Sequence, residues 1–145
     1  MSIQQISVVL ENRAGQLADI TAVLAQHNID MRAIHIAETS DYGVLRIIVD
    51  RPQKAASALL EHGFVLSMTP VLAVVVPDEP GALAKVLAIL AREQIDVEYM
   101  YSVFGRVNER ACMIFRVGDI ERPSAVLTAA GIAPVPGEAL GIHAE

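Results

Sequence analysis

The residues of this sequence that could bind a small ligand lie in one short run that occurs twice. The copies are Glu-Asn-Arg-Ala-Gly-Gln-Leu-Ala at residues 11–18 and Pro-Asp-Glu-Pro-Gly-Ala-Leu-Ala at residues 77–84. Each follows a β-branched apolar stretch and precedes apolar residues at helical spacing, which predicts a strand-to-helix turn with a glycine at its bend. Because unpaired backbone N–H groups and the positive end of a helix attract anions, we expect two anion-binding turns, the first turn and the second turn.

The repeat extends well beyond these turns. With Gly15 aligned to Gly81, residues 7–30 match residues 73–96 at ten of 24 positions without a gap. Two copies of one domain are the economical interpretation, with a first unit over residues 1–68 and a second over residues 69–145. A domain this small buries only about 60% of its unfolded surface, so we expect both units to gain from a shared interface.

Apolar periodicity predicts the same series of elements in each half. The order is β-α-β-β-α-β, with a change of parity near Arg32 and Ala33 that requires a β-bulge if Ile29, Met31, Ile34 and Ile36 are all buried. This order predicts an α+β fold of two ferredoxin-like units side by side, each an antiparallel sheet with both helices on one face. The expected strands are 3–10, 29–37, 44–50, 64–68, 71–76, 95–104 and 111–117, with a short Pro-containing edge after Gly131, and the expected helices begin at Gln16, Pro52, Ala82 and Arg122 or Pro123.

Composition limits the class of protein. The longest apolar run, residues 71–76, is far too short to span a bilayer, and residues 1–6 lack the features of a signal peptide, so we expect a cytoplasmic protein with no membrane partner. The formal charge of −6 and the lack of a clustered basic stretch argue against a nucleic-acid partner. A single cysteine, Cys112, excludes an internal disulfide framework and a multi-cysteine metal site.

The sequence carries no signature of catalysis. It has no Ser-His-Asp order, no nucleotide-binding glycine loop and no paired carboxylates in an expected pocket. Its histidines fall in separate predicted elements without metal-ligand spacing. We therefore predict a protein that is not an enzyme, with no catalytic residue, no cofactor and no metal.

The repeated pattern resembles the ACT domain, a small regulatory module of amino-acid metabolism. The resemblance rests on a strand, an Asn or Asp shortly before a glycine (Asn12, Asp78), a Leu-rich helix and a following Ile-Asp pair. Two copies cover essentially the whole chain, which looks like the stand-alone tandem ACT proteins, and the first copy also resembles the small regulatory subunit of acetolactate synthase. The second turn is similar to phenylalanine-binding ACT domains, but it lacks their Glu-Ser-Arg-Pro run and has Glu98-Tyr-Met-Tyr instead, so phenylalanine is not supported.

The resemblance implies a free amino acid bound where two units meet, between the turn of one and the second strand of its neighbour. Backbone N–H groups of the turns suit the ligand carboxylate, and backbone carbonyls or the side chains of Asn12 and Asp78 suit its ammonium group. The expected contact residues are Asn12, Arg13, Ala14, Gly15, Gln16 and Leu17 in the first turn, Asp78, Glu79, Pro80, Gly81, Ala82 and Leu83 in the second, and Met31, Ile34, Tyr99 and Met100 on the strands.

Several alternatives remain open at this point. Each turn has an ordinary structural explanation, in which Asn12 or Asp78 caps the next N–H groups and the glycine only permits the bend. Counting charges in the turns alone, Asp78 and Glu79 oppose a carboxylate, so the first turn is expected to bind better. The leading functional hypothesis is a homodimeric amino-acid sensor. The alternative is a regulatory subunit that acts mainly through contact with a biosynthetic enzyme.

Overall fold

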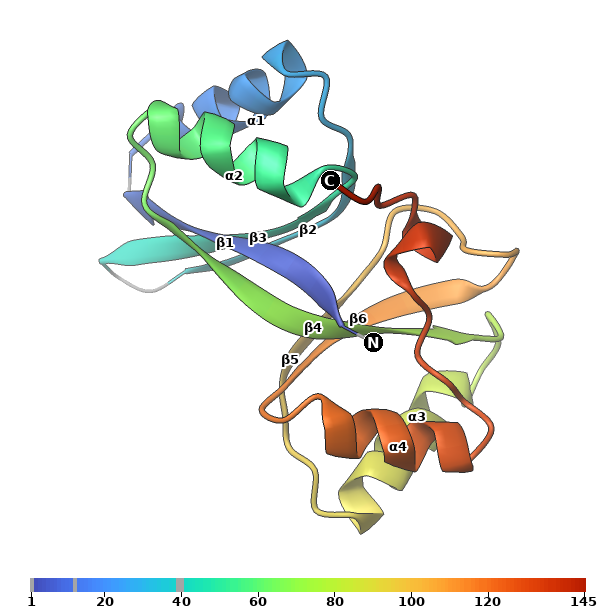
Figure 1. The fold of residues 1–145 in the computed structure, drawn as a ribbon. Coiled ribbons are helices and arrows are strands. Elements are labelled where there is room, and N and C mark those ends of the chain that lie inside the picture. The colour runs from blue at the N-terminus through green and yellow to red at the C-terminus, as the bar shows by residue number, and fades with distance from the viewer. Residues whose placement is uncertain (1, 12, 39–40) are drawn as a thin grey trace. The chain divides into compact units, whose positions relative to one another are not determined.

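The computed structural model describes residues 2–11, 13–38 and 41–145, and the chain repeats one series of strands and helices (Figure 1). The predicted Asn12 contact lies outside the described residues. The elements are β1 (Ile3–Glu11), α1 (Gln16–Gln26), β2 (Met31–Glu38), β3 (Tyr42–Val49), α2 (Pro52–Glu61), β4 (Leu66–Val76), α3 (Ala82–Arg92), β5 (Val97–Ser102), β6 (Ala111–Val117), α4 (Glu121–Ala129) and the 3-10 helix η1 (Gly137–Leu140).

The chain forms two compact units whose division falls inside β4. The N-terminal unit comprises Gln4–Thr69 with Gly141–Glu145, and the C-terminal unit comprises Pro70–Leu140 with the residues up to Ile3. The sequence predicts two strands here, separated by a connection at residues 67–70, whereas the structure has the single strand β4. Pro70 is tolerated because its fixed φ suits extended backbone, and its carbonyl accepts a hydrogen bond from Arg116 Nη1 at 2.9 Å.

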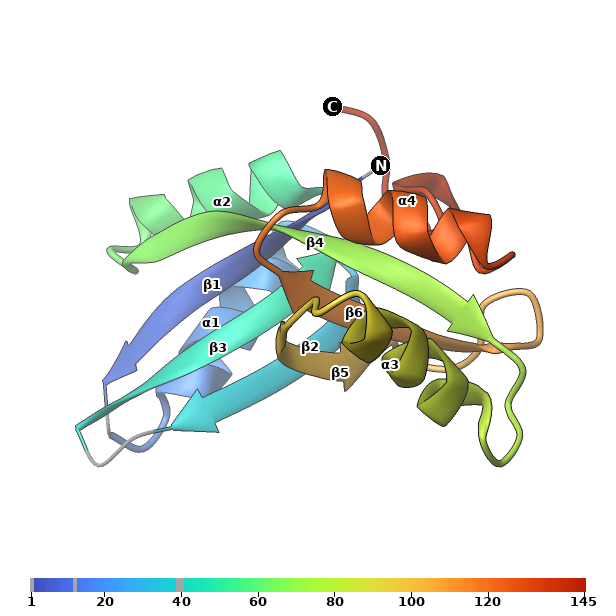
Figure 2. The same cartoon turned by 90° about the horizontal axis from the view of Figure 1, so that it is seen from below.

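In the N-terminal unit, β3 lies between β2 and β1 and pairs antiparallel with both. The register of β2 shifts between Met31 and Ala33, which confirms the predicted bulge. Both helices cover one face of these strands (Figures 1 and 2). The apolar stripes of α1 and α2 meet the inward residues of β1 and β3 there, in a core that includes Ile6, Ile20, Leu24, Ile47 and Leu59.

The C-terminal unit repeats this arrangement with β6 between β4 and β5. Its β5 also shifts register, between Val97 and Tyr99. Helices α3 and α4 lie on one face of the strands, over a core that includes Leu90, Phe115 and Leu127 (Figure 1). The predicted last edge forms no regular strand, since its two prolines cannot donate to a ladder, but Val135 N–H donates to the Ala73 carbonyl of β4 at 2.9 Å.

The last five residues, Gly141–Glu145, belong to the N-terminal unit. The His143 N–H donates to the Asp50 carbonyl at 2.8 Å. The Glu145 carboxylate accepts the N–H groups of Gln53 at 2.7 Å and Lys54 at 2.9 Å. The segment that the sequence leaves as an irregular tail therefore caps the N-terminus of α2.

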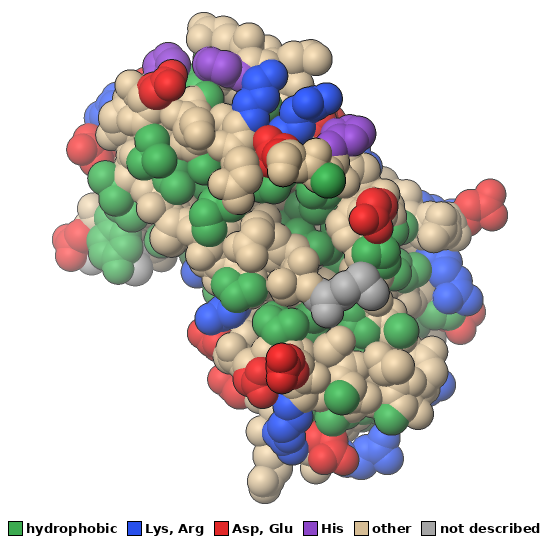
Figure 3. Space-filling model, viewed as in Figure 1, with side chains coloured by type: hydrophobic (Ala, Val, Ile, Leu, Met, Phe, Trp, Pro, Cys, Tyr) green, Lys and Arg blue, Asp and Glu red, His purple; other side chains and the backbone are tan. Residues whose placement is uncertain are grey.

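Within the described ranges, no helix has the length and apolarity needed to cross a membrane. On the face that Figure 3 shows, Lys and Arg side chains are scattered among Asp and Glu side chains, and apolar side chains are exposed between them.

Candidate functional site

Both turns begin their helices at a glycine with left-handed backbone. Gly15 has φ 87° and ψ −11°, and Gly81 has φ 87° and ψ −13°. A side chain at either position is strained whatever the space, because L-residues rarely adopt this conformation. A Cβ atom would meet nothing within 4 Å at either glycine. The glycines are thus required by the conformation of the bend, and the structural explanation of their presence holds at both turns.

The second turn leaves backbone donors free at the start of α3. The Ala82 N–H donates to the Glu79 carbonyl at 3.3 Å, and the Lys85 N–H donates to the Gly81 carbonyl at 3.0 Å. The N–H groups of Leu83 and Ala84, which lie between them, have no acceptor among the described residues. Such groups at a helix start are satisfied by water or by a ligand.

The first turn contains a hydrogen bond from the backbone to a buried side chain, and the second turn lacks this bond. Gln16 is only 7% exposed, and its Oε1 accepts the N–H of Glu11. The aligned residues of the second copy are Ala82 and Pro77, and proline has no N–H to satisfy. The two replacements are consistent with each other: Pro77 has no N–H to donate, so the second turn needs no side-chain acceptor at Ala82.

A cavity lies beside each turn, within a single unit. The first cavity, of about 430 Å³, lies between the first turn, α1 and the loop after α2, and the second cavity, of about 250 Å³, lies between the second turn, α3 and the loop after α4. The first is lined by Glu11, Arg13, Gln16, Asp19, Ala22, Val23, Gln26, His62, Gly63 and Phe64, and the second by Val75, Val76, Pro77, Glu79, Ala82, Lys85, Arg110, Gly131 and Ile132. Six residues of one cavity align with six of the other in the repeat.

The first cavity is acidic once its ion pairs are taken into account. Its arginine, Arg13, lies 3.3 Å from the carboxylate of Glu11 and 4.0 Å from that of Asp19. One cation therefore faces two anions, and a ligand carboxylate meets net negative charge there.

The second cavity has the opposite balance. The cations Lys85 and Arg110 line it together with the anion Glu79. Neither Lys85 nor Arg110 forms an ion pair with another described residue, whereas Asp78 is paired with Arg106 at 2.9 Å. Charge counted from the turns alone favours the first turn. Once the cavity-lining charges are included, the first cavity has more anions than cations and the second has more cations than anions. The expectation that the first turn binds better stays a prediction.

The structure distributes the predicted contact residues over different roles. Arg13 and Gln16 line the first cavity, and Glu79 and Ala82 line the second. The other described turn residues do not line either cavity: Ala14, Leu17 and Pro80 are exposed, and Leu83 packs against the C-terminal core.

The predicted strand residues contribute to the interior of their own units. Met31 and Ile34 pack against the N-terminal core and Met100 against the C-terminal core. Tyr99 stacks on Tyr101 with ring centroids 6.4 Å apart and an interplanar angle of 14°. None of these four residues lines the first or the second cavity, and their role in ligand binding stays a prediction.

Three charged residues that line the cavities, Asp19, Lys85 and Arg110, are not among the contact residues predicted from the sequence. Asp19 and Lys85 could have been predicted from the sequence, because each lies about one helical turn after its glycine and the repeat aligns these two opposite charges. Arg110 had no such signal, since it belongs to the longer hairpin of the second copy and reaches the second cavity only through the fold.

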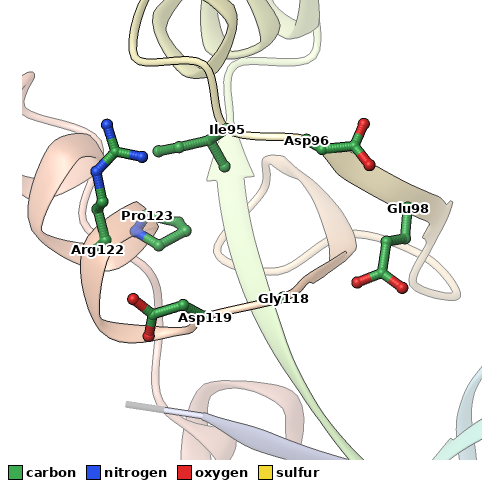
Figure 4. Close-up of a pocket in the computed structure, with 7 residues that line it drawn as sticks. All are labelled: Ile95, Asp96, Glu98, Gly118, Asp119, Arg122 and Pro123. Carbon is green, nitrogen blue, oxygen red and sulfur yellow. The ribbon is translucent and has the colours of Figure 1, made fainter.

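A third cavity, of about 310 Å³, lies at the start of α4 (Figure 4). Its charged side chains are largely engaged: Glu98 lies 3.7 Å from Arg116 Nε, Asp119 accepts the Glu121 N–H at 3.1 Å, and Arg122 donates to the Glu93 carbonyl at 2.6 Å. Figure 4 shows the carboxylates of Asp96, just before β5, and of Glu98, in β5, pointing in different directions. Nowhere in the described ranges do three His, Cys, Asp or Glu side chains group as metal ligands.

Cys112 is placed as a core residue. It is buried in β6, and burial raises the pKa of its thiol to about 11. The thiol is protonated at neutral pH, so it lacks the thiolate that a nucleophilic cysteine needs.

Comparison with protein families identifies the chain. The family described as an ACT domain pair matches residues 1–140, so this protein belongs to that family, as the sequence resemblance predicts. ACT domains are regulatory modules that bind amino acids. A sequence comparison with curated proteins gives no significant match. The narrower resemblance of the first copy to the acetolactate synthase small subunit stays a prediction.

Solved structures agree with this assignment. The crystal structure of protein BT0572 from Bacteroides thetaiotaomicron is 39% identical over 97% of this chain and 96% of that chain, with a TM-score of 0.90. The regulatory subunit of aspartate kinase from Thermus thermophilus is 20% identical over 88% and 90%, with a TM-score of 0.63. The corresponding subunit from Thermus flavus is 18% identical over 88% and 90%, with a TM-score of 0.58. At these lower identities the two subunits show a shared fold alone.

Proposed function

We propose that this protein is a non-catalytic regulatory protein that binds a free amino acid through its strand-to-helix turns. The observation that carries the proposal is the glycine turn itself, present twice in an ACT domain pair and leaving the N–H groups of Leu83 and Ala84 without an acceptor among the described residues. Backbone N–H groups at a helix start suit the carboxylate that every free amino acid carries.

Regulation follows from binding if the ligand prefers one of two conformations of the protein. A ligand shifts such an equilibrium only by its difference in affinity for the two states. Three further parts of the proposal are predictions from the sequence: a ligand position where two ACT units meet, a homodimer and a cytoplasmic location. The first test of the proposal does not depend on them.

A second function is favoured by one specific observation. Two solved structures with the same fold are regulatory subunits of aspartate kinase. By analogy, this protein would act mainly through contact with an amino-acid biosynthetic enzyme, with or without a ligand of its own.

A thermal-shift screen of the full chain against each common amino acid tests the proposal. We expect one amino acid, or a few related ones, to raise the melting temperature in proportion to the logarithm of concentration, because a ligand that binds only the folded state stabilises it by mass action. The amide of the same amino acid, which lacks the carboxylate, is the control and should give no shift. A screen without any hit would contradict the sensor, and co-purification with a biosynthetic enzyme would then favour the regulatory subunit.

A further inference from the structure

The second cavity differs from the first in ways that suit one class of ligand. We propose that it binds a small amino acid with an aliphatic side chain, holding the carboxylate between Lys85 and Arg110. The inference rests on the proposed function. It specifies a ligand class, and it places the ligand within one unit in place of the position where two units meet that the sequence predicts.

The charges of the second cavity match the two charged groups of an amino acid. Lys85 lies in α3, and Arg110 directly precedes β6. Both line the second cavity, and neither forms an ion pair with another described residue. Unpaired cations bind a carboxylate through charge-assisted hydrogen bonds, which are stronger than neutral ones. Glu79 lines the cavity as well and is placed to accept the ligand ammonium group.

The rest of the second cavity is apolar and small. Val76 is only 6% exposed, and it lines the cavity with Val75, Pro77, Ala82 and Ile132. The volume of about 250 Å³ is below the range of roughly 300–1,000 Å³ typical of sites for drug-sized molecules. A compact ligand with a short hydrocarbon side chain suits these walls, whereas a second charged group would lose its hydration against them.

The aligned residues of the first cavity remove each of these features. Asp19 stands where the second copy has Lys85, and Arg13 stands where it has Glu79, so both charges are reversed. Gln16 fills the position of Ala82 with a buried amide that is already bonded to the Glu11 N–H. The same fold thus presents two related cavities, of which only the second has unpaired cations over an apolar wall.

Isothermal titration calorimetry on the full chain tests the proposal, with L-valine, L-leucine and L-isoleucine as probes and L-aspartate and L-lysine for comparison. We expect an aliphatic probe to bind, and Lys85→Gln and Arg110→Gln each to weaken binding about tenfold, as loss of a hydrogen bond to a charged group does. Lys85→Arg keeps the charge and should keep most of the affinity. Ala82→Gln introduces the residue that the first copy carries and should weaken binding, because it places a polar amide on the apolar wall of the second cavity.

Matched controls separate the cavity from general effects of charge and folding. Arg92→Gln removes a cation from the same helix, away from the cavity, and should leave affinity unchanged. Melting temperatures without ligand show whether each variant folds. Binding that survives Lys85→Gln, Arg110→Gln and Ala82→Gln would overturn this inference and leave the proposed function standing. Preference for L-aspartate or L-lysine, or a thermal-shift hit with another amino acid and none with the aliphatic probes, would overturn the ligand class. No hit in the thermal-shift screen of all common amino acids would overturn both proposals.

Discussion

Gly15 and Gly81 each set the direction in which a helix leaves its strand. Both have a φ of 87°, in the left-handed region, and neither has a neighbour that a Cβ atom would contact. Any cost of replacing them therefore comes from backbone strain and not from a clash. Left-handed backbone costs an L-residue roughly 1–2 kcal/mol relative to glycine.

Gly81→Ala should accordingly lower the free energy of unfolding by about 1–2 kcal/mol, measured by urea denaturation. Gly118→Ala is the control, because Gly118 lies outside the left-handed region and its nearest Cβ neighbour, Glu98 Oε2, is 4.0 Å away. The strain argument would be wrong if the two substitutions cost the same.

At the scale of elements, α2 obtains its N-terminal cap from a distant part of the chain. Its N-cap residue, Arg51, offers no side-chain hydrogen bond, and Pro52 begins the helix without an N–H. The next two N–H groups, of Gln53 and Lys54, are accepted by the Glu145 carboxylate. The negative charge also complements the positive end of the helix dipole.

Glu145→Ala should therefore destabilise the protein by about 1 kcal/mol, the usual cost of removing a cap. Urea denaturation followed by circular dichroism measures the effect, which should weaken at high salt because the site is exposed. Glu138→Ala removes an exposed carboxylate that forms no hydrogen bond or ion pair with the described residues, and it should change stability little. Equal effects of the two substitutions would show that Glu145 does not cap α2.

At the scale of the whole molecule, each unit has a hydrophobic core of its own. The N-terminal core gathers residues from α1, α2, β1 and β3, and the C-terminal core gathers residues from α3, α4, β4 and β6. The stability of each unit therefore depends on the packing of its own core residues.

Leu59 and Leu60 of α2 provide a sharp test of the N-terminal core. Leu59 is 0% exposed and Leu60 is 55% exposed, although they are neighbours in one helix. Leu59→Ala should cost about 2–5 kcal/mol, through lost burial and the cavity left behind, and Leu60→Ala should cost well under about 1 kcal/mol. Chemical denaturation of both variants measures these losses in the free energy of unfolding. A small effect of Leu59→Ala would place the core elsewhere.

The sequence by itself determined the duplication, the order of the elements, the β2 bulge and the two glycine bends. These features depend on local periodicity and on backbone preferences, which are properties of residues close together in the sequence. The same local rules also led to the expectation of a break at residues 67–70, where the tertiary structure keeps one strand, β4.

Only the tertiary structure decided which charges face each turn. Asp78 and Glu79 are read from the sequence as unfavourable, but Arg106 from the hairpin pairs with Asp78, and Lys85 and Arg110 line the second cavity. Glu145 likewise reaches α2 across 91 residues of chain. Electrostatic interactions act between groups that folding brings close in space, so their balance at a site follows from the fold and not from the neighbours of a residue in the sequence.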